Sequence, residues 1–484
     1  PALTPHTRFK VWTDSAVAIR VNVMAYALLR AATLTSCDDA RYERLFRAML
    51  DHILLLCADH FFSGTDNHGL LQILGLLVFT KALPCFSWGA HVQALATKRL
   101  RKLLERMVTS EGFVREHSSE YQAAILPILA NMERFLTEES DRQFLRTQLK
   151  SLRAALAHFI RPDGSLAPLG DTPPFISPST LNEITRARAR VARQKDLALF
   201  PKSGYAFVRA RLGDNAANNV SWLALQGAFH SRIHKHCDDL AFLWSEGKQN
   251  ILVDSGQQYG YDGLLFVGPL YDKGFYFSAP NRVYSESVHA HNAVEIHGES
   301  YSRKIPPPGA LPLSGGQLSE KYWLLEGEWQ RPEGFRQQRR LVFSPARWLL
   351  VMDEVQPLSV ASPEHTSFSQ WFHLDASLNL LSCERGQACA MLPDKRKLYC
   401  QNLNYGELSH HKGEFAPRMQ AWQATESTQW LEPAWTIGVH QRGKAAQFAT
   451  LFSLCGPCIS FRVIKHVCHI QFENESGDDI ILQL

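Results

Sequence analysis

The sequence predicts two kinds of structure in succession: a helical N-terminal domain of the α/α barrel or toroid type, then a large antiparallel β sandwich. Two observations carry this prediction. Before residue 200, apolar residues recur at helical spacing in long segments. After residue 200, short runs rich in aromatic and β-branched residues alternate with turn residues. The chain has 484 residues, which is enough for two or three domains.

The helical segments come first, and short polar or Gly/Pro connections separate them. Such a succession predicts helical hairpins packed side by side, as in an α/α toroid. Pro, Gly and Asp are frequent at 162–178, which predicts an irregular loop, and one more helix at 181–197 is expected to act as a bridge. We therefore place the first domain at residues 1–198. The earlier helical segments cover residues 17–34, 42–62, 70–82, 91–107, 121–136 and 141–160.

The second domain is expected to cover residues 199–484, with a subdivision near residue 390 left open. Turn residues separate its strand-like runs at fairly regular intervals, which favours an antiparallel sandwich. No internal repeat of fixed period is present. The expected strands include YAFVRARL from residue 205, VSWLALQGAF from 220, LAFLWSE from 240, NILVDSG from 250, NAVEIHG from 292, WLLEGEW from 323, RRLVFSP from 339, RWLLVMDEV from 347, CISFRVIKHV from 458 and IILQL from 480.

Composition excludes several classes of protein. Hydrophobic residues make up 45 % and charged residues 20 %, which is typical of a soluble globular chain. The formal net charge of +4 argues against a dedicated nucleic-acid binder but allows a local basic cleft facing an acidic polymer. No apolar run is long enough to span a membrane. The composition predicts no oligomeric state.

The start of the chain carries no signal peptide. It opens on Pro1 without an initiator Met, so we interpret the chain as a processed or trimmed form. The missing signal therefore says little about where the protein works.

One pair of the ten cysteines has the CxxC spacing of dithiol oxidoreductases, at Cys455 and Cys458. A redox motif of this kind should open a helix in an α/β unit. Here it lies between two strand-like runs, FATLFSL and ISFRVIKHV. We interpret it as a hairpin turn with two thiols.

Two short motifs in the helical domain carry polar groups suited to catalysis. Asn67 and His68 follow Asp66 at a helix start, where they either point into a cavity or belong to a helix cap. Tyr121 follows a loop rich in acidic and hydroxyl groups and opens the next helix. A tyrosine in a cleft can donate or take a proton, and the alternative is a ring that packs at a helix end.

A cluster of histidines in the second domain suggests a metal site. His234 and His236 are two residues apart, so on a strand they would share a face. Asp254 ends a later strand-like run, and His291 lies within RVYSESVHAHNAVEIHG. Two imidazoles and one carboxylate on neighbouring strands can hold zinc. The alternative is a set of histidines whose hydrogen bonds are satisfied within the sheet.

Together these motifs resemble the heparinase II/III-like polysaccharide lyases, a group that includes heparin, alginate and broader glycosaminoglycan lyases. The family has an α/α toroid followed by a β-sheet domain. The helical part, at roughly 200 residues, is short for this family, so the toroid is incomplete or the chain was trimmed at its start. The matching elements, in family order, are NHG from residue 67, ExSxxY from 116, DGSLAPLGD from 163, FPKSGYAFVR from 200, HKHCDDLAF from 234, LVDSG from 252 and RVYSESVHAHNAVEIHG from 282.

The resemblance implies a role for each candidate residue. Asn67, with His68, would neutralise the carboxylate of a uronate sugar. Tyr121 and His234 would move protons. A structural zinc ion would be held by His236, Asp254 and His291, where it organises the wall of the cleft.

In some relatives a second tyrosine from the β domain is catalytic. The residues leave five candidates open: Tyr259, Tyr261, Tyr271, Tyr276 and Tyr284. The resemblance also implies an acidic polysaccharide partner, no nucleic acid, no membrane, and a periplasmic or secreted protein.

The implied reaction explains why these residue types are needed. A lyase removes the weakly acidic proton at C5 of the uronate and expels the oxygen at C4. Amide and imidazolium donors neutralise the sugar carboxylate as charge spreads into it, and such preorganised donors are usually the largest catalytic contribution. Tyrosine starts at a pKa of about 10 and needs a cationic neighbour to act as a base, whereas histidine, at about 6.5, serves as acid or base.

Other activities stay open. A glycoside hydrolase on the same toroid would need two carboxylates across a cleft, and Glu116, Glu120 and Asp238 are candidates without an evident pair. A non-catalytic polysaccharide-binding protein of the same fold is a second alternative. A zinc hydrolase would need a motif such as HExxH, which is absent from the sequence. The substrate is open among heparan sulfate, hyaluronan, chondroitin and alginate.

Overall fold

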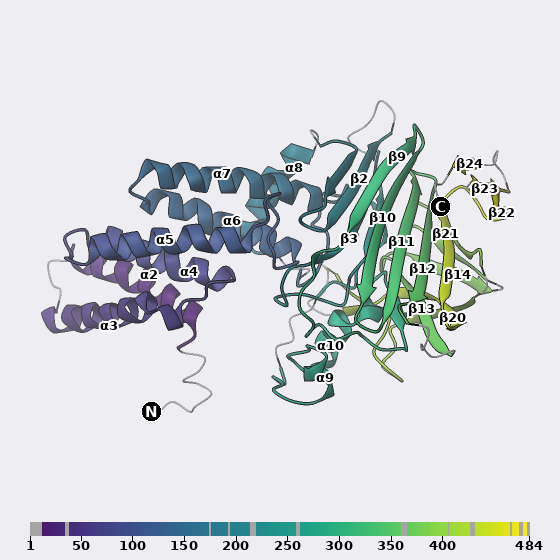
Figure 1. Cartoon of the computed structure of the whole chain (residues 1–484). Coiled ribbons are helices and arrows are strands. Elements are labelled where there is room, and N and C mark those ends of the chain that lie inside the picture. The colour runs from purple at the N-terminus through teal and green to yellow at the C-terminus, as the bar shows by residue number, and fades with distance from the viewer. Residues whose placement is uncertain are drawn as a thin grey trace. The chain divides into compact units, whose positions relative to one another are not determined.

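The structure is a computed structural model of the whole chain (Figure 1). It describes residues 12–33, 38–173, 176–191, 194–212, 219–257, 262–359, 365–384, 386–404, 406–425, 431–464, 467–473 and 478–481.

Contacts divide the chain into two compact units. The first unit comprises residues 1–114, 122–156 and 178–183, and the second comprises residues 115–121, 157–177 and 184–484. The second unit therefore takes in two short segments from the region where helices dominate. The predicted division at residues 198 and 199, and a subdivision near residue 390, stay predictions.

The first unit is helical, and its helices begin and end within a few residues of the predicted segments. Helix α8, the expected bridge, is shared between the two units, since the first unit ends at Glu183. The helices are α2 (Asp14–Ala31), α3 (Asp39–Cys57), α4 (Asn67–Ala82), α5 (Gly89–Met107), α6 (Ser119–Met132), α7 (Glu139–Leu156) and α8 (Pro178–Val191), with short 3₁₀ turns η1 (Asp59–Phe61), η2 (Glu133–Phe135) and η3 (Ala157–Phe159).

Aspartates start two of these helices. The Asp38 carboxylate accepts a hydrogen bond from the backbone N–H of Ala40 at the start of α3. Asp66 does the same for His68 at the start of α4. Side-chain oxygens at this position satisfy N–H groups that the helix itself leaves free. The polar residues that open α4 are therefore placed by a helix cap.

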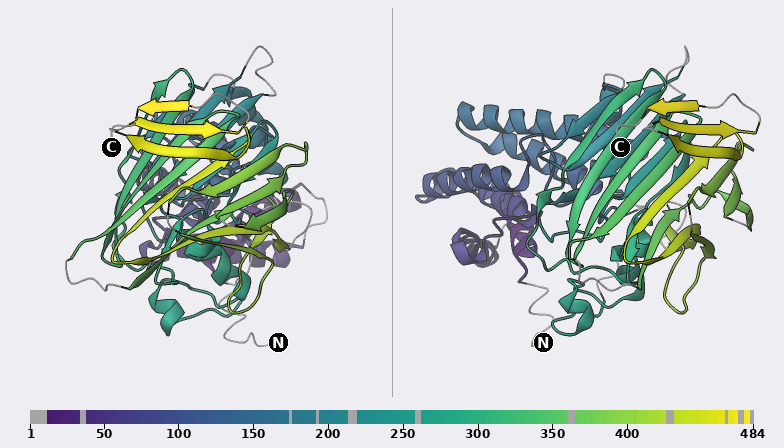
Figure 2. Two further views of the ribbon diagram at one scale, coloured as in Figure 1. Left: turned by 90° about the vertical axis from the view of Figure 1, so that its right-hand side faces the viewer. Right: turned by 45° about the vertical axis from the view of Figure 1, so that its right-hand side comes forward.

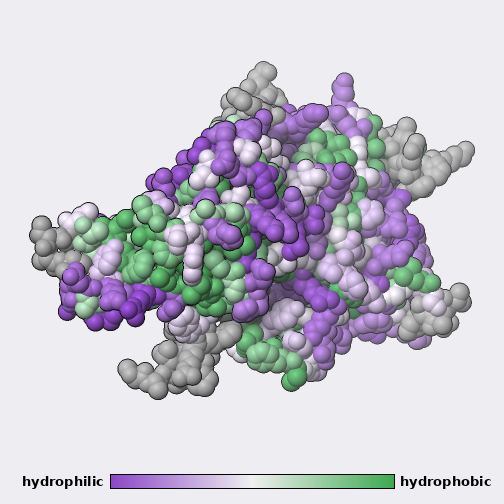
Figure 3. Space-filling model, turned by 60° about the vertical axis from the view of Figure 1, so that its left-hand side comes forward, coloured by the Kyte–Doolittle hydropathy of each residue, from purple (hydrophilic) through white to green (hydrophobic). Residues whose placement is uncertain are grey.

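Helix α2 is apolar around nearly its whole circumference. One side is buried within the unit through residues such as Val17, Val21 and Leu28. Large apolar side chains also lie on its other side, where Val23 is 61 % and Tyr26 is 67 % exposed. Figure 3 shows apolar side chains gathered over the helical unit. The helical spacing of apolar residues thus predicts this helix, but it does not mark a single buried stripe.

The second unit is built from antiparallel sheets. Its largest sheet has eight strands in the order β14-β15-β16-β21-β12-β11-β10-β9 within the described residues. These strands are β9 (Leu313–Ser319), β10 (Tyr322–Arg331), β11 (Phe335–Ser344), β12 (Trp348–Pro357), β14 (Asn379–Glu384), β15 (Gln387–Met391), β16 (Lys397–Asn402) and β21 (Ala446–Ser453).

Two smaller sheets complete the sandwich, with orders β1-β2-β3-β5-β6 and β17-β20-β13-β7. Their strands are β1 (Leu197–Phe200), β2 (Tyr205–Arg211), β3 (Val220–Gln226), β5 (Phe242–Glu246), β6 (Gln249–Leu252), β7 (Val294–Ile296), β13 (Thr366–His373), β17 (Glu407–Lys412) and β20 (Trp435–Gly443). Short pieces are β4 (Ala228–Phe229), β8 (Gly309–Ala310), β18 (Trp422–Ala424), β19 (Leu431–Pro433), and the helices α9 (Pro269–Asp272), α10 (Pro280–Glu286) and η4 (Val288–Ala290). The helical region followed by a large antiparallel β domain confirms the predicted fold class.

Alternation along the long strands divides the apolar side chains between two cores. On β11, Leu341 and Phe343 belong to the main core, which they share with residues of the two smaller sheets. Val342, between them, belongs to a second core with Trp348 and Leu350 of β12. Successive side chains of a strand point to opposite faces, so the eight-stranded sheet is covered on both sides.

The second core is closed by the last strands of the chain, β22 (Cys458–Ile464), β23 (Val467–Phe472) and β24 (Asp478–Ile481). Figure 2 shows these three strands crossing one face of the long sheet. The predicted hairpin at Cys455 and Cys458 is therefore wrong. Strand β21 pairs with β12 and β16, whereas β22 pairs with β23, so the CxxC segment connects two sheets.

A buried ion pair anchors the segments that lead into β5 and β7. The Arg339 guanidinium of β11 donates to both oxygens of Asp353 on β12, at 2.8 and 2.7 Å, and both residues are buried. The same guanidinium donates to the carbonyl oxygens of Leu240 and Asn292, at 2.7 and 2.5 Å. Leu240 lies four positions after the predicted zinc ligand His236, and Asn292 lies one position after the predicted ligand His291. Arg339 therefore fixes the segments before β5 and before β7 to the long sheet.

Glu246 is a carboxyl group at the end of β5 that is buried away from these loops. The indole N–H of Trp244 donates to it at 2.7 Å, and the Ser221 hydroxyl also donates to it. Burial raises the pKa of the Glu246 carboxyl to about 7, against the opposite effect of the two hydrogen bonds. Part of the stability of this unit therefore depends on pH.

Candidate active site

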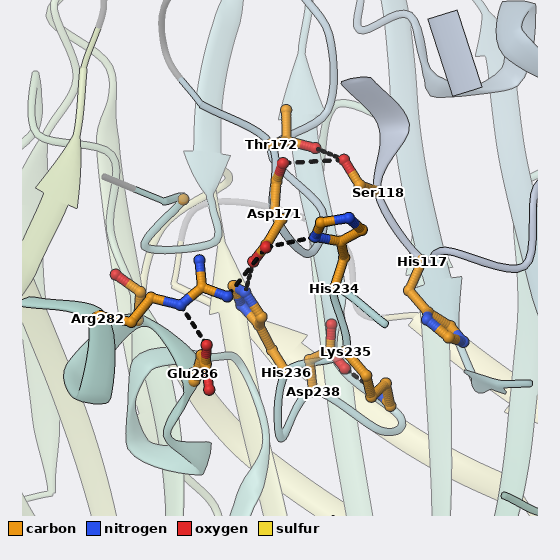
Figure 4. A network of polar contacts seen from close by, with 12 residues as sticks. His117, Ser118, Asp171, Thr172, His234, Lys235, His236, Asp238, Arg282 and Glu286 are labelled. Atoms are coloured by element: carbon orange, nitrogen blue, oxygen red, sulfur yellow. Dashed lines mark hydrogen bonds and ion pairs between the residues drawn. The ribbon is translucent and has the colours of Figure 1, made fainter. Parts of the chain in front are cut away.

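Asp171 is the centre of a buried polar network in the second unit (Figure 4). One carboxylate oxygen lies 2.7 Å from Nε2 of His236, and the other lies 2.6 Å from Nδ1 of His234. The Arg282 guanidinium donates to the second oxygen at 3.0 Å. Three charge-assisted hydrogen bonds thus converge on one side chain that is only 4 % exposed.

The network sets the protonation states of its members. Burial alone would raise the pKa of the Asp171 carboxyl, but the charge of Arg282 and the hydrogen bonds from His234 and His236 hold it well below its usual range. Burial lowers the pKa of the His234 imidazole, but Asp171 and the charge of Glu116 outweigh it, so this pKa lies above its ordinary value. The arrangement therefore favours a carboxylate beside an imidazolium.

Tyr121 lies directly against this imidazole. The rings of Tyr121 and His234 are stacked, with centroids 4.0 Å apart and planes inclined by 19°. Both belong to the second unit, because residues 115–121 pack there, and Tyr121 occupies the first turn of α6 as predicted. The structure thus brings together the two residues predicted to move protons.

Two carboxyl groups lie beside the ring pair. Oε2 of the buried Glu116 is 3.4 Å from Nε2 of His234. Burial raises the pKa of Glu120 to about 6, although the charge of His234 acts in the opposite direction. A carboxyl group with such a pKa can hold or release a proton near neutral pH.

The histidines lie on an irregular loop between β4 and β5, so the expectation that they share a face of a strand is wrong. His234 has a φ of 53°, a left-handed conformation that a strand does not contain. Gly170 packs closely against this loop: a Cβ added there would lie 3.0 Å from the carbonyl oxygen of His234 and 2.6 Å from that of His117. Gly170 also has a positive φ of 53°, so a larger residue would displace Asp171, its neighbour.

Further buried ion pairs lie next to the Asp171 network and fix the positions of its members. Glu286 accepts hydrogen bonds from Arg282 and from Arg303. Lys235 is completely enclosed and pairs with Asp238, one of the carboxylates considered for a hydrolase. That pairing occupies the Asp238 charge, so this residue is a structural member of the loop.

A pocket of about 300 Å³ opens onto His234 within the second unit. Of the candidate second tyrosines, Tyr276 lines this pocket and is 38 % exposed. Tyr284 is buried, and its hydroxyl donates to the carbonyl oxygen of Trp422 at 2.9 Å. Tyr271 packs against Tyr276, and Tyr259 and Tyr261 lie outside the described residues. The pocket is lined by Asp171, Arg232, Ile233, His234, Lys235, Tyr276, Phe277, Arg282, Glu286 and Arg303.

Asn67 and His68 belong to the first unit, at the start of α4. Nδ1 of His68 lies 3.0 Å from a carboxylate oxygen of Asp14 in the same unit, and its side chain is 49 % exposed. Gly69 follows because the backbone is crowded here: an added Cβ would lie 2.0 Å from the carbonyl oxygen of Ser63. The capping function falls to Asp66, which leaves the roles of Asn67 and His68 as predictions.

The predicted zinc ligands lie close together, and two of their ring nitrogens are available. The rings of His236 and His291 have centroids 5.5 Å apart. Nδ1 of His236 and Nε2 of His291 are buried without a hydrogen-bond partner among the described residues. One carboxylate oxygen of Asp254 lies 2.7 Å from Nδ1, the other ring nitrogen of His291.

These residues fit a metal in part. Two orphaned imidazole nitrogens are suitable ligand atoms, and buried nitrogens of this kind are rare without a partner. No group of three or more His, Cys, Asp or Glu side chains is arranged to hold an ion in the part of the chain that the structure describes. Zinc therefore stays a proposal.

Sequence reasoning did not select several members of the network, namely Asp171, Arg282 and Glu286. Asp171 closes the motif DGSLAPLGD, so its place in the resemblance was a usable signal. Arg282 opens RVYSESVHAHNAVEIHG in the same way. Local spacing does not reveal these contacts, because Asp171 is 63 residues from His234 and 111 residues from Arg282 along the chain.

The fold, a helical region followed by a large antiparallel β domain, is that of the toroid and sandwich type. The chain belongs to the heparinase II/III-like family: residues 192–453 match the family's profile, described as heparinase II/III-like, C-terminal. No curated protein matches the sequence significantly.

Solved structures share the architecture of the whole chain. The heparan sulfate lyase HepC from Pedobacter heparinus is 13 % identical, with a TM-score of 0.70 over 100 % of this chain and 76 % of that one. A crystal structure of heparinase III is 12 % identical, with a TM-score of 0.73 over 97 % of this chain and 75 % of that one. At such identity the likeness shows the fold. Among the described residues, no helix is both long and apolar enough to cross a membrane.

Proposed function

We propose that this protein is a polysaccharide lyase that cleaves a uronate-containing glycosaminoglycan, such as heparan sulfate, hyaluronan or chondroitin, by β-elimination. The stacked pair of Tyr121 and His234 is the observation that carries the proposal. The family and the fold support it, because the related structures include heparan sulfate lyase and heparinase III. Alginate is the alternative uronate polymer.

The chemistry begins with removal of the C5 proton. A positive charge close to a phenol favours its deprotonated form, and His234 carries such a charge when both its ring nitrogens are protonated, the form that the Asp171 carboxylate beside Nδ1 favours. Tyr121 is then placed to take the proton as a base. The electron pair of the C5–H bond becomes part of a C4–C5 double bond, and the bond from C4 to the glycosidic oxygen breaks.

The departing oxygen takes a proton as it leaves. His234 can supply it, since the imidazolium is an acid near neutral pH. Asn67 and His68 are proposed to neutralise the uronate carboxylate, which lowers the cost of the negative charge that develops there. The products are a new reducing end and an unsaturated uronate, and no water is consumed.

Zinc is proposed to be held by His236, His291 and Asp254. When bound, it would supply a fixed positive charge that stabilises the wall of the site. The Asp171 carboxylate contacts both His234 and His236. A zinc ion that fixed the position of His236 would therefore also help to fix the position of His234. We also propose a periplasmic or secreted location, where acidic polysaccharides are met.

The experiment is to follow ultraviolet absorbance of the unsaturated product during incubation with a panel of uronate polymers. We expect a rise with at least one polymer, and we expect Tyr121→Phe and His234→Ala to abolish it. Tyr121→Phe keeps the ring stacked on His234, so its loss of activity would be chemical. Binding of a polymer without any absorbance rise would support the alternative, a non-catalytic protein of the same fold.

A further inference from the structure

The first unit contains a groove that the proposed chemistry does not use. It has a volume of about 1220 Å³ and runs between α5 and the segment that leads from η2 into α7. Six of its lining residues are Lys or Arg and three are Asp or Glu, a formal charge of +3 in a chain whose total is +4. The charged lining residues are Lys81, Lys98, Arg101, Lys102, Arg134 and Arg142, with Glu105, Glu138 and Asp141.

Some of these cationic side chains are paired with carboxylates of the same unit, and others are not. Arg101 donates to Asp141 at 2.8 Å, so that pair is neutral. Lys81, Lys98 and Lys102 are exposed. None of them has an ion pair within 4.0 Å among the described residues, although the charge of Lys98 lowers the pKa of the exposed Asp59. Lys98 and Lys102 are four residues apart on α5, so their side chains are neighbours on one face of the helix. Like charges held this close are unfavourable unless an anion lies between them.

The floor of the groove is held by hydrogen bonds. Thr80 donates to the amide oxygen of Gln93 at 2.7 Å, and the Gln93 amide donates to the carbonyl oxygen of Phe135 at 3.2 Å. This chain of contacts joins the end of α4, α5 and η2 in one frame. Phe135 itself lines the groove and is half-buried, and the Arg134 guanidinium lies over its ring, 5.6 Å from the ring centroid. A groove with cations and a half-buried aromatic ring suits an acidic sugar chain, whose rings have both anionic groups and apolar C–H faces.

The groove and the predicted catalytic amide lie at opposite ends of one helix. Asn67 is the first residue of α4, and Thr80 and Lys81 belong to its last turn. At 1.5 Å per residue, the 16 residues of α4 separate these ends by roughly 20 Å. The groove is therefore not an extension of the surface around Asn67.

We propose that this groove is a second binding site for acidic polysaccharide, which captures a distant stretch of the same polymer that is cleaved. The inference rests on the proposed function for the identity of the polymer. A second site raises the local concentration of substrate at the first, so it affects long chains and not short ones. The cations of the groove, with Lys81, Lys98 and Lys102 as the free members, provide the attraction.

The test is the affinity for fluorescently labelled heparan sulfate, measured by anisotropy in a Tyr121→Phe background so that the polymer stays intact. The variant Lys81→Gln, Lys98→Gln, Lys102→Gln should bind about tenfold more weakly, because three exposed ion pairs between the protein and the anionic groups of the polymer are lost. A matched control, Arg30→Gln, Arg44→Gln, Lys150→Gln, removes the same charge from exposed positions outside the groove. It should bind within twofold of the parent.

Kinetics on the catalytically intact chain give the second readout. The groove variant should raise KM for long polymer and leave kcat/KM for a tetrasaccharide unchanged. Equal affinity of the groove variant and the control would overturn the inference, as would displacement of the polysaccharide by single-stranded DNA of the same charge at equal concentration. Failure of the lyase proposal is seen separately, as the absence of unsaturated product from the unmutated chain.

Discussion

Substitution of Asp171 by asparagine tests the network at its centre. The carboxylate takes three charge-assisted hydrogen bonds, two of them on the oxygen that faces His234 and Arg282. An asparagine can keep its amide oxygen toward those two partners, but as a neutral acceptor. The contribution of each hydrogen bond to the free energy of unfolding then falls from about 1.5–3 to about 0.5–1.5 kcal/mol, which is a loss of about 2–3 kcal/mol for the two bonds together.

The same loss should appear in catalysis, because Asp171 positions His234 and supports its charge. A loss of about 2.7 kcal/mol at the transition state lowers kcat about a hundredfold, with KM little changed. Initial rates of unsaturated-product formation measure it, and denaturant unfolding measures the stability loss. The control is Asp163→Asn in the same loop, whose partners are Ser165 and Asn250, with no imidazole. A kcat for Asp171→Asn within threefold of that control would refute the reasoning.

Three further predictions follow from buried groups. The folded chain binds the Glu246 proton more tightly than the unfolded chain. The contribution of this carboxyl to stability is therefore fully present below about pH 4, and about 3 kcal/mol of it is lost as pH rises to 7. Glu246→Gln should remove this contribution from the pH dependence of the unfolding free energy, and an unchanged pH dependence would contradict it. Asp353→Ala leaves the Arg339 charge buried and should cost about 3–5 kcal/mol in the same experiment, whereas a loss below 1 kcal/mol would mean that water compensates the arginine. Elemental analysis should find about one zinc per chain, chelation should lower Tm, and His236→Ala with His291→Ala should abolish the zinc; a metal-free chain of unchanged Tm would exclude the ion.

The fold was predictable because its signals are local. Helices α2 to α8 follow from apolar spacing, and the start of α4 follows from the capping residue Asp66. The long strands β10 to β12 follow from alternation, which the two cores explain. The CxxC segment was misread because a turn between two strand-like runs does not reveal which sheet each strand joins. Strand partners are set by contacts between residues that are distant in sequence, and the local sequence pattern does not predict these contacts.

The sequence predicted only those site residues that stand in a recognisable local motif. Tyr121 and His234 were singled out from their own motifs and took their roles from the resemblance, and the structure brings them together. The placement of His234 and His236 on a strand failed, because the left-handed backbone at His234 and the crowding at Gly170 impose a loop. Asp171 was missed for a related reason. Its importance comes from accepting bonds from three side chains that only the folded chain assembles.

The most direct test of the central claim is the fate of water oxygen during cleavage of the preferred polymer. The chain should be incubated in water labelled with heavy oxygen, and the products analysed by mass spectrometry. Elimination consumes no water, so we expect oligosaccharides with an unsaturated uronate at the new non-reducing end and no more label than a reducing sugar gains by exchange of its anomeric oxygen in the same water. Incorporation of labelled oxygen into saturated products would show hydrolysis, and it would contradict the roles given to Tyr121 and His234.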